Sequence, residues 1–480
     1  MGRVKLMPDY LKNILHTQFF SILNIIVGFV SLFLLIKYLH VEEYGEYVLI
    51  QGFLAFVGLI ISQNIYSYAR LKIPGSEENI QYGYLKTVIS LVSGFYLFIF
   101  IVIWLFGLSE IFWNFFEINL ELSLIVVLML ALELINAEIM RFLIALKNIH
   151  IKNYAQFFQK VFILFVVLGL LFLDSLSLNS FLYLFIVGQI IVLFYLINHI
   201  QVKIFFNAPF MKDVIQKGYQ IALPLIPIGL MSLALNYTDT LMIAKMIDKE
   251  SVAQYGFSSQ IVSIVMMIIG TSIILTLFPY ATESFNKNDL KRKNDFFIKM
   301  YIYSISLSII FYVLIVLNIT WFVELLNLES YKDVPIYLMI LAIFPIFQSI
   351  YNVSSHNMQL LKIVKVQLYI AIFVIFCNVI LNFFFIKKFG VIGAAYASLI
   401  SFMLLSIVYF ILTLKNDLYL RESFSFSIRK IIVLIGIFLL LFLLLFFINK
   451  QNLYFVLLGN ILVFVSLGIG FKKLRKGFRK

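Results

Sequence analysis

Long apolar stretches separated by short polar segments run along the whole chain. A helix that crosses the hydrocarbon core of a bilayer needs roughly 20 mostly apolar residues, and fourteen stretches approach that length. The pattern therefore predicts an all-α, polytopic membrane protein with about fourteen transmembrane helices. The predicted spans are 14–36, 47–69, 86–106, 121–144, 157–173, 180–198, 219–244, 254–280, 297–322, 334–360, 365–386, 391–414, 429–448 and 452–470.

The composition leads to the same class of protein. Of the 480 residues, 62% are hydrophobic and 13% are charged, whereas about a quarter of a soluble domain is charged. No water-soluble packing hides so much apolar surface, so the solvent must be lipid. The single cysteine, Cys377, excludes an intramolecular disulfide and a cysteine-based metal cluster. We expect no metal, no cofactor and no nucleic-acid partner.

Lysine and arginine gather in alternate loops. With the N-terminus placed in the cytoplasm, 30 of the 37 basic residues fall on the cytoplasmic side, as the positive-inside rule requires. The exceptions are Lys37, Lys245, Lys249, Lys332, Lys387, Lys388 and Lys450. This bias predicts a multi-pass protein of the cytoplasmic membrane with both termini inside, and it accounts for cations such as Lys160 as topology signals.

The loops are too short to form a soluble catalytic domain, since none exceeds about 20 residues. Nucleotide-binding and hydrolase motifs such as Gly-x-x-x-x-Gly-Lys-[Ser/Thr] and His-Glu-x-x-His are absent from the sequence. We therefore expect a protein that is not an enzyme and that draws energy from an ion gradient, the membrane potential or the substrate gradient.

An internal repeat organises the spans. Tyr44-Gly45 and Tyr255-Gly256 each follow an apolar span, and a Tyr-Ala pair comes 24 residues later in the first copy and 25 in the second. Six spans separate the copies, so both have the same orientation in the membrane. We expect an N-lobe (1–218), a C-lobe (219–425) and a segment 426–480 that holds an appended helix pair and a basic cytoplasmic tail. Parallel six-helix lobes of this kind are typical of transporters.

Three segments carry a family resemblance: the run from Lys37 to Gly45, Asp239 with the later Tyr255-Gly256, and the run from Asn378 to Ser401. They resemble the Wzx-type oligosaccharide flippases of the multidrug/oligosaccharidyl-lipid/polysaccharide exporter superfamily. That family's first hairpin commonly reads Arg-Leu-Leu-Gly-Pro-Glu-Glu-Tyr-Gly. This chain has Lys37 for the arginine, His40-Val41 for Gly-Pro, and then Glu42-Glu43-Tyr44-Gly45. Asp239 followed by Tyr255-Gly256 is similar to a second family segment, with the Gly and Tyr order reversed. The run from Asn378 to Ser401, with Asn382, Gly390 and Gly393, is close to the family's junction between its eleventh and twelfth helices.

The resemblance implies alternating access and the export of undecaprenyl-diphosphate-linked oligosaccharide units for O-antigen, capsule or exopolysaccharide. It also implies a bacterial inner membrane and pathway partners such as glycosyltransferases and a polysaccharide polymerase. A cation-coupled multidrug antiporter of the same superfamily is the alternative, although such antiporters typically have twelve helices. A membrane-embedded polymerase or ligase is a further alternative, but it needs a longer external loop.

Charged residues at membrane depth are expensive and by default face a cavity or a partner. Glu133 lies near the middle of its span without an obvious local partner, which makes it a candidate ion-coupling carboxylate. Asp239 is the second candidate, although we favour a structural pairing with Lys37 or Lys245. Glu138 and Arg141 are three residues apart and can pair on one helix face.

A lipid diphosphate needs fixed cations in the cavity that carries it. The cations nearest the lobe interior are Lys12, Lys37, Arg70, Arg141, Lys160 and Lys245. The positive-inside rule already explains Lys12, Arg70, Arg141 and Lys160, and the candidates retained are Lys37, Arg70, Arg141 and Lys245. The resemblance favours Arg70, whereas Lys37 and Lys245 fall on the side where the positive-inside rule does not explain them. Proline kinks helices, and the candidate hinges are Pro224, Pro227 and Pro345.

Overall fold

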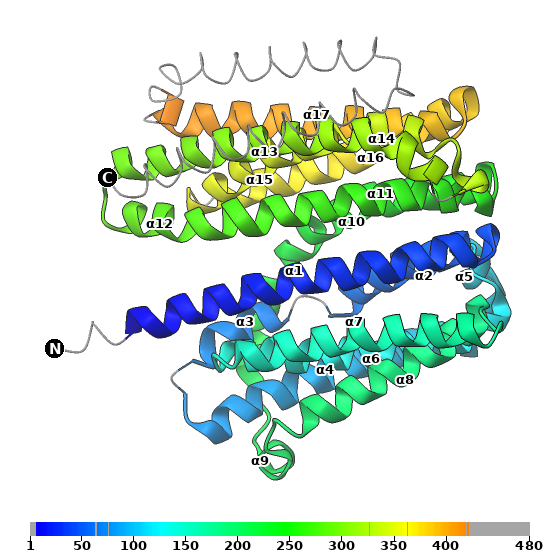
Figure 1. The fold of residues 1–480 in the computed structure, drawn as a ribbon. Coiled ribbons are helices and arrows are strands. Elements are labelled where there is room, and N and C mark those ends of the chain that lie inside the picture. The colour runs from blue at the N-terminus through cyan, green and yellow to red at the C-terminus, as the bar shows by residue number, and fades with distance from the viewer. Residues whose placement is uncertain are drawn as a thin grey trace. The chain divides into compact units, whose positions relative to one another are not determined.

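A computed structural model describes residues 6–62, 65–74, 76–325, 327–361, 363–418 and 420–421. Every regular element in these ranges is a helix (Figure 1). Eleven helical stretches among them are long and apolar enough to cross a membrane, which confirms the all-α, polytopic class. The predicted spans 429–448 and 452–470 and the basic tail lie outside the described residues.

The chain forms two compact units that divide between Ala253 and Gln254. The first unit holds α1 (Leu6–Tyr38), α2 (Val41–Ser62), α3 (Tyr66–Lys72), α4 (Glu78–Leu105), α5 (Ser109–Phe115), α6 (Ser123–Ala145), α7 (Ile149–Phe172), α8 (Leu178–Ile197), α9 (Val202–Asn207), the π-helix η2 (Val214–Gly218), α10 (Tyr219–Met246) and the start of α11 (Lys249–Ile269). The second unit holds the rest of α11, the π-helix η3 (Gly270–Ile274), α12 (Leu275–Asn286), α13 (Leu290–Leu325), α14 (Val334–Leu341), α15 (Phe344–Leu360), α16 (Val364–Phe389) and α17 (Val391–Asn416).

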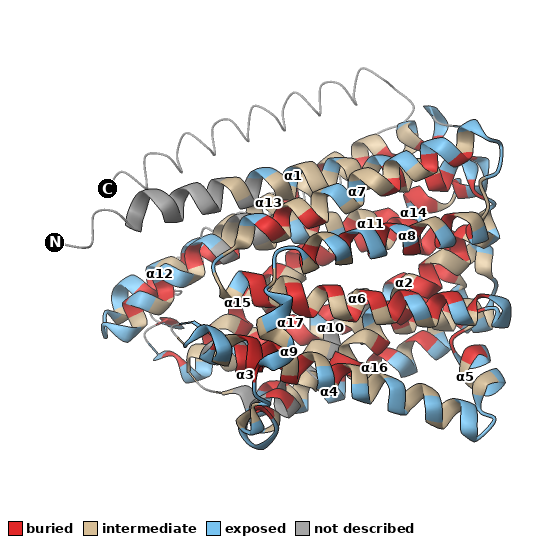
Figure 2. Ribbon diagram, turned by 90° about the horizontal axis from the view of Figure 1, so that it is seen from below, coloured by how far each residue is buried: buried red, intermediate tan, exposed pale blue. Residues whose placement is uncertain are grey.

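Long helices pack side by side within the first unit. Helix α1 lies along α7, α7 along α8, α8 along α6, α6 along α4, and α10 along α2. Figure 2 shows many buried positions on α2 and α6. By contrast, Phe98, Trp104 and Phe165 on α4 and α7 are 61%, 75% and 66% exposed. Large apolar side chains that point away from the protein are expected where lipid is the solvent.

Helix α2 starts earlier and ends earlier than the apolar pattern predicts. The predicted span is 47–69, whereas the helix runs from Val41 to Ser62 and the short α3 follows. Glu42 and Glu43 occupy its first turn, where carboxylates interact favourably with the helix dipole. The helix therefore begins in polar sequence, before the apolar run.

Two glycines let α2 approach α10 and the start of α11 closely. A Cβ on Gly45 would overlap the backbone carbonyl of Lys249, and a Cβ on Gly52 would overlap the ring of Tyr237. An ion pair between Glu46 and Lys249, 3.2 Å long, reinforces the first contact. The Tyr44-Gly45 dipeptide of the repeat therefore has a packing role in this fold.

Equivalent positions of the repeat have similar local structure. Tyr44 and Tyr255 are buried near the starts of α2 and α11. Leu146-Lys147 and Leu361-Lys362 hold matching places after the fourth and the tenth predicted span, and Leu146 and Leu361 are the C-cap residues of α6 and α15. The assignment of 1–218 and 219–425 to two lobes stays a prediction.

Helix boundaries in the second unit refine two predicted spans. Helix α13 has 36 residues, about 54 Å of helix, so it extends well beyond a hydrocarbon core that is about 30 Å thick. The predicted span 334–360 is two helices, α14 and α15, with a turn at Ala342 and Ile343. Pro345 lies in the first turn of α15, where its missing N–H removes no helical hydrogen bond.

Small polar side chains join the helices of the second unit. The Tyr301 hydroxyl lies 2.7 Å from Ser354 Oγ, and Ser308 donates to the carbonyl of Pro345 at 3.0 Å. Ser406 donates to the carbonyl of Phe347 at 2.7 Å. Interhelical hydrogen bonds of this kind hold helices together in lipid, where apolar surface alone gives no preference for protein over solvent.

The close approach at Gly45 predicts an unequal response to alanine. We expect Gly45→Ala to lower the stability of the protein by about 1–3 kcal/mol, because its methyl group must displace the backbone at Lys249. Gly94→Ala is the matched control, since nothing lies within 4 Å of a Cβ at that position of α4. It should be neutral or stabilising by about 0.5–1 kcal/mol. Thermal unfolding of the purified chain measures both, and equal midpoints would contradict the packing role of Gly45.

Candidate functional site

Two ionisable side chains lie near the midpoints of spanning helices in the first unit. Glu133 is the eleventh of the 23 residues of α6, and Lys160 is the twelfth of the 24 residues of α7. The apolar pattern places Lys160 near the start of a span that begins at residue 157. Because α7 begins at Ile149 instead, the charge of Lys160 lies half-way along the helix. The first turns of α7 are polar, so the apolar pattern does not reveal that the helix starts this early. Asn153 in these turns forms a 3.2 Å hydrogen bond with His16 on α1.

Lys160 reaches from α7 to α1 and interacts electrostatically with α6. Its Cδ and Nζ lie 3.8 and 4.0 Å from the position that a Cβ on Gly28 would occupy. Lys160 is exposed, and its charge lies within electrostatic range of the Glu133 carboxylate, which is also within electrostatic range of the phenol of Tyr47 on α2. The opposite charge near Glu133 therefore comes from another helix. We call these four residues, Gly28, Tyr47, Glu133 and Lys160, the midspan cluster.

Two further amides lie on the same helices as the midspan cluster. Asn24 is one turn before Gly28 on α1, and Gln51 is one turn after Tyr47 on α2. Asn24 Oδ1 and Gln51 Nε2 are buried without a hydrogen-bond partner. A buried polar atom without a partner costs about 1–3 kcal/mol, so both atoms are suited to bind a polar ligand.

Arg141 is already paired inside α6. Its guanidinium donates to Glu138, whose side chain is 1% exposed, and the Tyr66 hydroxyl donates to the Arg141 carbonyl. The pairing expected from the spacing is confirmed. A phosphate at Arg141 would have to share the guanidinium with Glu138.

The other predicted cations lie apart from the midspan cluster along their helices. Lys37 is exposed in the last turn of α1, and Lys245 is exposed in the last turn of α10, with Nζ 4.3 Å from the ring centroid of Phe115. Asp239 is buried in α10, 1% exposed. The backbone of Arg70 belongs to α3, but its side chain lies outside the described part of the structure.

The candidate hinge residues differ in how far the structure describes them. Pro224 and Pro227 lie in the first half of α10, and their side chains are outside the described part. Pro345 is buried at the turn between α14 and α15. Their role as hinges stays a prediction.

A second buried charge pair lies in the second unit. Lys293 in the first turn of α13 donates to Asp417 at the end of α17, and the two side chains are 1% and 4% exposed. Asn357 Nδ2 and the backbone N–H of Leu420 also donate to Asp417, at 3.1 and 3.0 Å. The sequence groups Lys293 with the cytoplasmic loop cations and gives no sign that it is buried, because its partner lies 124 residues away.

The run from Asn378 to Ser401 forms the hairpin of α16 and α17. Asn378 Nδ2 donates to Ser398 Oγ and Ser401 Oγ, each at 3.3 Å. Gly390 joins the helices with φ +61°, a conformation that glycine adopts without strain. The residues that carry the resemblance are thus side chains and glycines that hold two helices together.

Comparisons with known proteins agree with this fold. Residues 224–384 match the family model described as MatE. The structure of the lipid II flippase MurJ in an inward closed conformation has a TM-score of 0.69 at 17% identity, over 95% of this chain and 99% of that one. An inward-facing multidrug resistance MATE family transporter has a TM-score of 0.67 at 13% identity, over 84% and 99% of the two chains.

A third structure extends the same comparison. A transporter of the MOP superfamily from Pyrococcus furiosus has a TM-score of 0.57 at 13% identity, over 85% of this chain and 96% of that one. No curated protein sequence matches the chain significantly. At these identities the likeness establishes the fold, which is that of multi-pass transporters.

The buried pair of the second unit predicts a large difference between two lysines. We expect Lys293→Met to cost about 3–5 kcal/mol, because it leaves the Asp417 carboxylate buried without a counter-charge. Lys287→Met is the matched control, since Lys287 pairs with Glu283 four residues earlier and both are more than half exposed. The hydrogen bond and the charge of Lys287 lower the pKa of the Glu283 carboxyl, but a pair this exposed is screened by water and contributes little to stability.

Thermal unfolding of the purified chain measures these differences. The double variant Lys293→Met/Asp417→Asn should recover part of the loss, because it removes both buried charges. If Lys293→Met unfolded at the temperature of Lys287→Met, the pair would not be buried as described.

Proposed function

We propose that this protein is a flippase that moves undecaprenyl-diphosphate-linked oligosaccharide units across the bacterial cytoplasmic membrane. It is not an enzyme in this proposal, and the work is done by alternating access between the lobes 1–218 and 219–425, with 426–480 appended. The units serve O-antigen, lipopolysaccharide, capsule or exopolysaccharide synthesis, next to the glycosyltransferases and polymerase of the pathway. The multi-pass helical fold and its likeness to a lipid II flippase support this proposal.

The midspan position of Lys160 carries the proposal. A diphosphate cannot enter hydrocarbon without a compensating charge, and Lys160 offers an ammonium half-way along a spanning helix. Asn24 and Gln51 add polar atoms on α1 and α2. Lys160 therefore joins Lys37, Arg70, Arg141 and Lys245 as a proposed diphosphate ligand. Arg141 is less available, because it would have to share its guanidinium with Glu138.

Glu133 is the proposed ion-coupling carboxylate, with Asp239 as the second candidate. Glu133 lies where its charge can compensate that of Lys160. A diphosphate that binds Lys160 would repel the carboxylate and favour its protonation or its binding of a cation. Substrate and coupling ion would thus be linked through one lysine.

A cation-coupled multidrug antiporter is the alternative, supported by the MatE match and the MATE family structure. The two functions differ in the charge of the cargo. A fixed ammonium attracts an anionic headgroup and repels a cationic drug, so Lys160 favours the flippase.

Removing the charge of Lys160 tests the flippase directly. In cells whose own gene is deleted, we expect Lys160→Gln to reduce the delivery of lipid-linked repeat units to the outer face by roughly tenfold or more, the effect of losing one charged hydrogen bond. Lys388→Gln is the control, because both lysines are exposed but Lys388 lies in the last turn of its helix, α16, whereas Lys160 lies half-way along α7. The measurement is the fraction of repeat units accessible at each face, at equal amounts of protein in the membrane.

The same assay evaluates the other cations. Lys37→Gln and Lys245→Gln should reduce delivery if these residues lie on the substrate path, and unchanged delivery would remove them from it. Normal surface glycan after deletion of the gene, with no redundant flippase, would contradict the proposed function. Lost drug resistance with normal glycan would support the antiporter.

Removing the charge of Glu133 separates coupling from binding. We expect Glu133→Gln to abolish the dependence of transport on an imposed proton or sodium gradient, while movement of the substrate down its own gradient persists because Lys160 remains. Proteoliposomes with and without the gradient provide the measurement. Gradient-dependent transport at the wild-type level would exclude Glu133 as the coupling carboxylate.

A further inference from the structure

Backbone groups of the linker between α8 and α10 form hydrogen bonds with side chains in the first half of α4. The Gln201 N–H donates to the Tyr82 hydroxyl at 2.8 Å, and the Met211 N–H donates to Thr87 Oγ1 at 2.8 Å. Lys86 Nζ donates to the carbonyls of Phe206 and Ala208, at 2.6 and 3.0 Å. The short helix α9 is thus held at a defined place beside α4.

The one acidic residue of this linker faces the protein. Asp213 accepts hydrogen bonds from the hydroxyls of Tyr68 and Tyr84, at 3.0 and 2.8 Å. The attached linker therefore has fixed contacts at its start, its middle and its end. The backbone on the α9 side of a cavity between α9 and α4 is therefore held in place.

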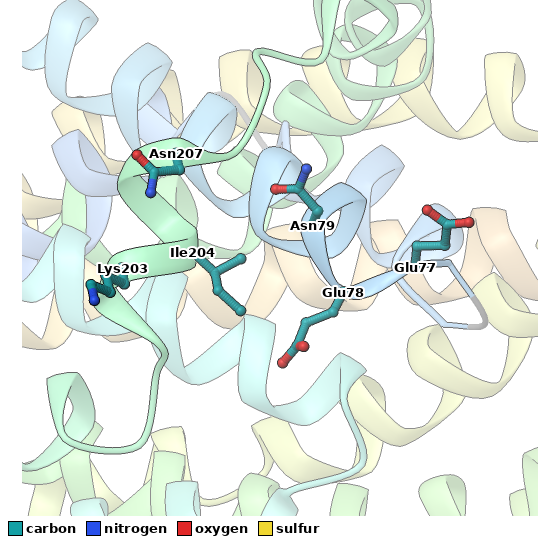
Figure 3. A pocket seen from close by; sticks show the side chains of 6 residues that line it. All are labelled: Glu77, Glu78, Asn79, Lys203, Ile204 and Asn207. Atoms are coloured by element: carbon teal, nitrogen blue, oxygen red, sulfur yellow. The ribbon is translucent and has the colours of Figure 1, made fainter.

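The cavity has a volume of about 480 Å³ and opens at the level where the spanning helix α4 begins. Figure 3 shows Glu77 and Glu78 on the side of α4 and Lys203 on the opposite side, on α9. Its remaining lining residues are Asn79, Ile204 and Asn207. Gln201 Nε2 donates to Glu78, which fixes the orientation of that carboxylate.

The charges of the walls select a dipolar ligand. The lining holds two carboxylates and one ammonium, so an anionic ligand meets an excess of negative charge and a simple cation meets Lys203. A ligand with a phosphate and a primary amine satisfies both walls: Lys203 and Asn207 can donate to the phosphate, and Glu77 and Glu78 can accept from the ammonium. Lys203 and Asn207 are four residues apart on α9 and therefore lie on one face of it.

The surroundings of the cavity fit a lipid. None of the described residues of α9 is buried, and Val202 and Phe206 are 40% and 67% exposed. Exposed apolar side chains next to polar ones at the end of a spanning helix are typical of the headgroup region. The positive-inside bias predicts that this is the cytoplasmic surface.

We propose that this cavity binds the headgroup of an aminophospholipid of the inner leaflet, with a phosphate and a primary amine as in phosphatidylethanolamine. A quaternary amine has no N–H to donate to Glu77 and Glu78, so phosphatidylcholine binds more weakly. An anionic lipid such as phosphatidylglycerol lacks the ammonium and meets the two carboxylates. The cavity is a lipid site of the linker, independent of the cargo that the protein moves.

Native mass spectrometry of the purified full chain with each of the three lipids tests this proposal. We expect phosphatidylethanolamine to bind most tightly, and the double variant Glu77→Gln/Glu78→Gln to reduce its preference over phosphatidylcholine by roughly tenfold. The glutamine at 78 still accepts from Gln201, so the wall stays folded. Lys203→Gln should weaken all three lipids, and Lys212→Gln, an exposed linker lysine outside the cavity, should change none.

Three outcomes would overturn the proposal. They are equal binding of phosphatidylethanolamine and phosphatidylcholine by the unmodified chain, cavity variants that behave like Lys212→Gln, and competition by soluble O-phosphoethanolamine at the concentrations at which the lipid binds. The last outcome would identify a site for a soluble phosphate amine.

Discussion

Inside a bilayer no water is present to hydrogen-bond an amide or a side chain, and this constraint determines most of what is seen here. Each spanning segment satisfies its backbone by forming a helix. Each polar side chain at depth must then find a partner within the protein. Ser308 and Ser406 do so on neighbouring backbone carbonyls. Burial inside the protein imposes the same requirement on Lys293, which pairs with Asp417.

The same constraint explains which parts of the architecture can be predicted from the sequence. Apolar length predicts a spanning helix because the bilayer has a fixed thickness, and that prediction holds for the eleven described stretches. Helix ends are less predictable, because polar residues extend helices beyond the apolar run. Helices α2 and α7 both begin before their predicted spans, at Val41 and Ile149.

The candidate site was predictable only in part. A lone carboxylate in an apolar run makes Glu133 a candidate from the sequence alone, and its role stays a prediction. Lys160 is also a candidate cation, but the positive-inside rule explains it as a topology signal because the apolar pattern puts it near the end of a span; a helix start eight residues earlier puts it in the middle. Lys293 and Asp417 lie 124 residues apart, and no local pattern reports such a pairing. Individual partners across helices depend on packing, which spacing along one helix does not contain.

The position of Lys160 half-way along α7 has an electrical consequence for the proposed function. A charge half-way across a membrane experiences half of the transmembrane potential, which is about 1 kcal/mol per elementary charge at 100 mV. With the cytoplasm negative, an anion is driven outward, so a doubly charged headgroup that reaches Lys160 has already released about 2 kcal/mol. In the proposed function the membrane potential would then favour the outward movement of the substrate-loaded protein. Depolarisation would slow this outward movement more than the return of the unloaded protein.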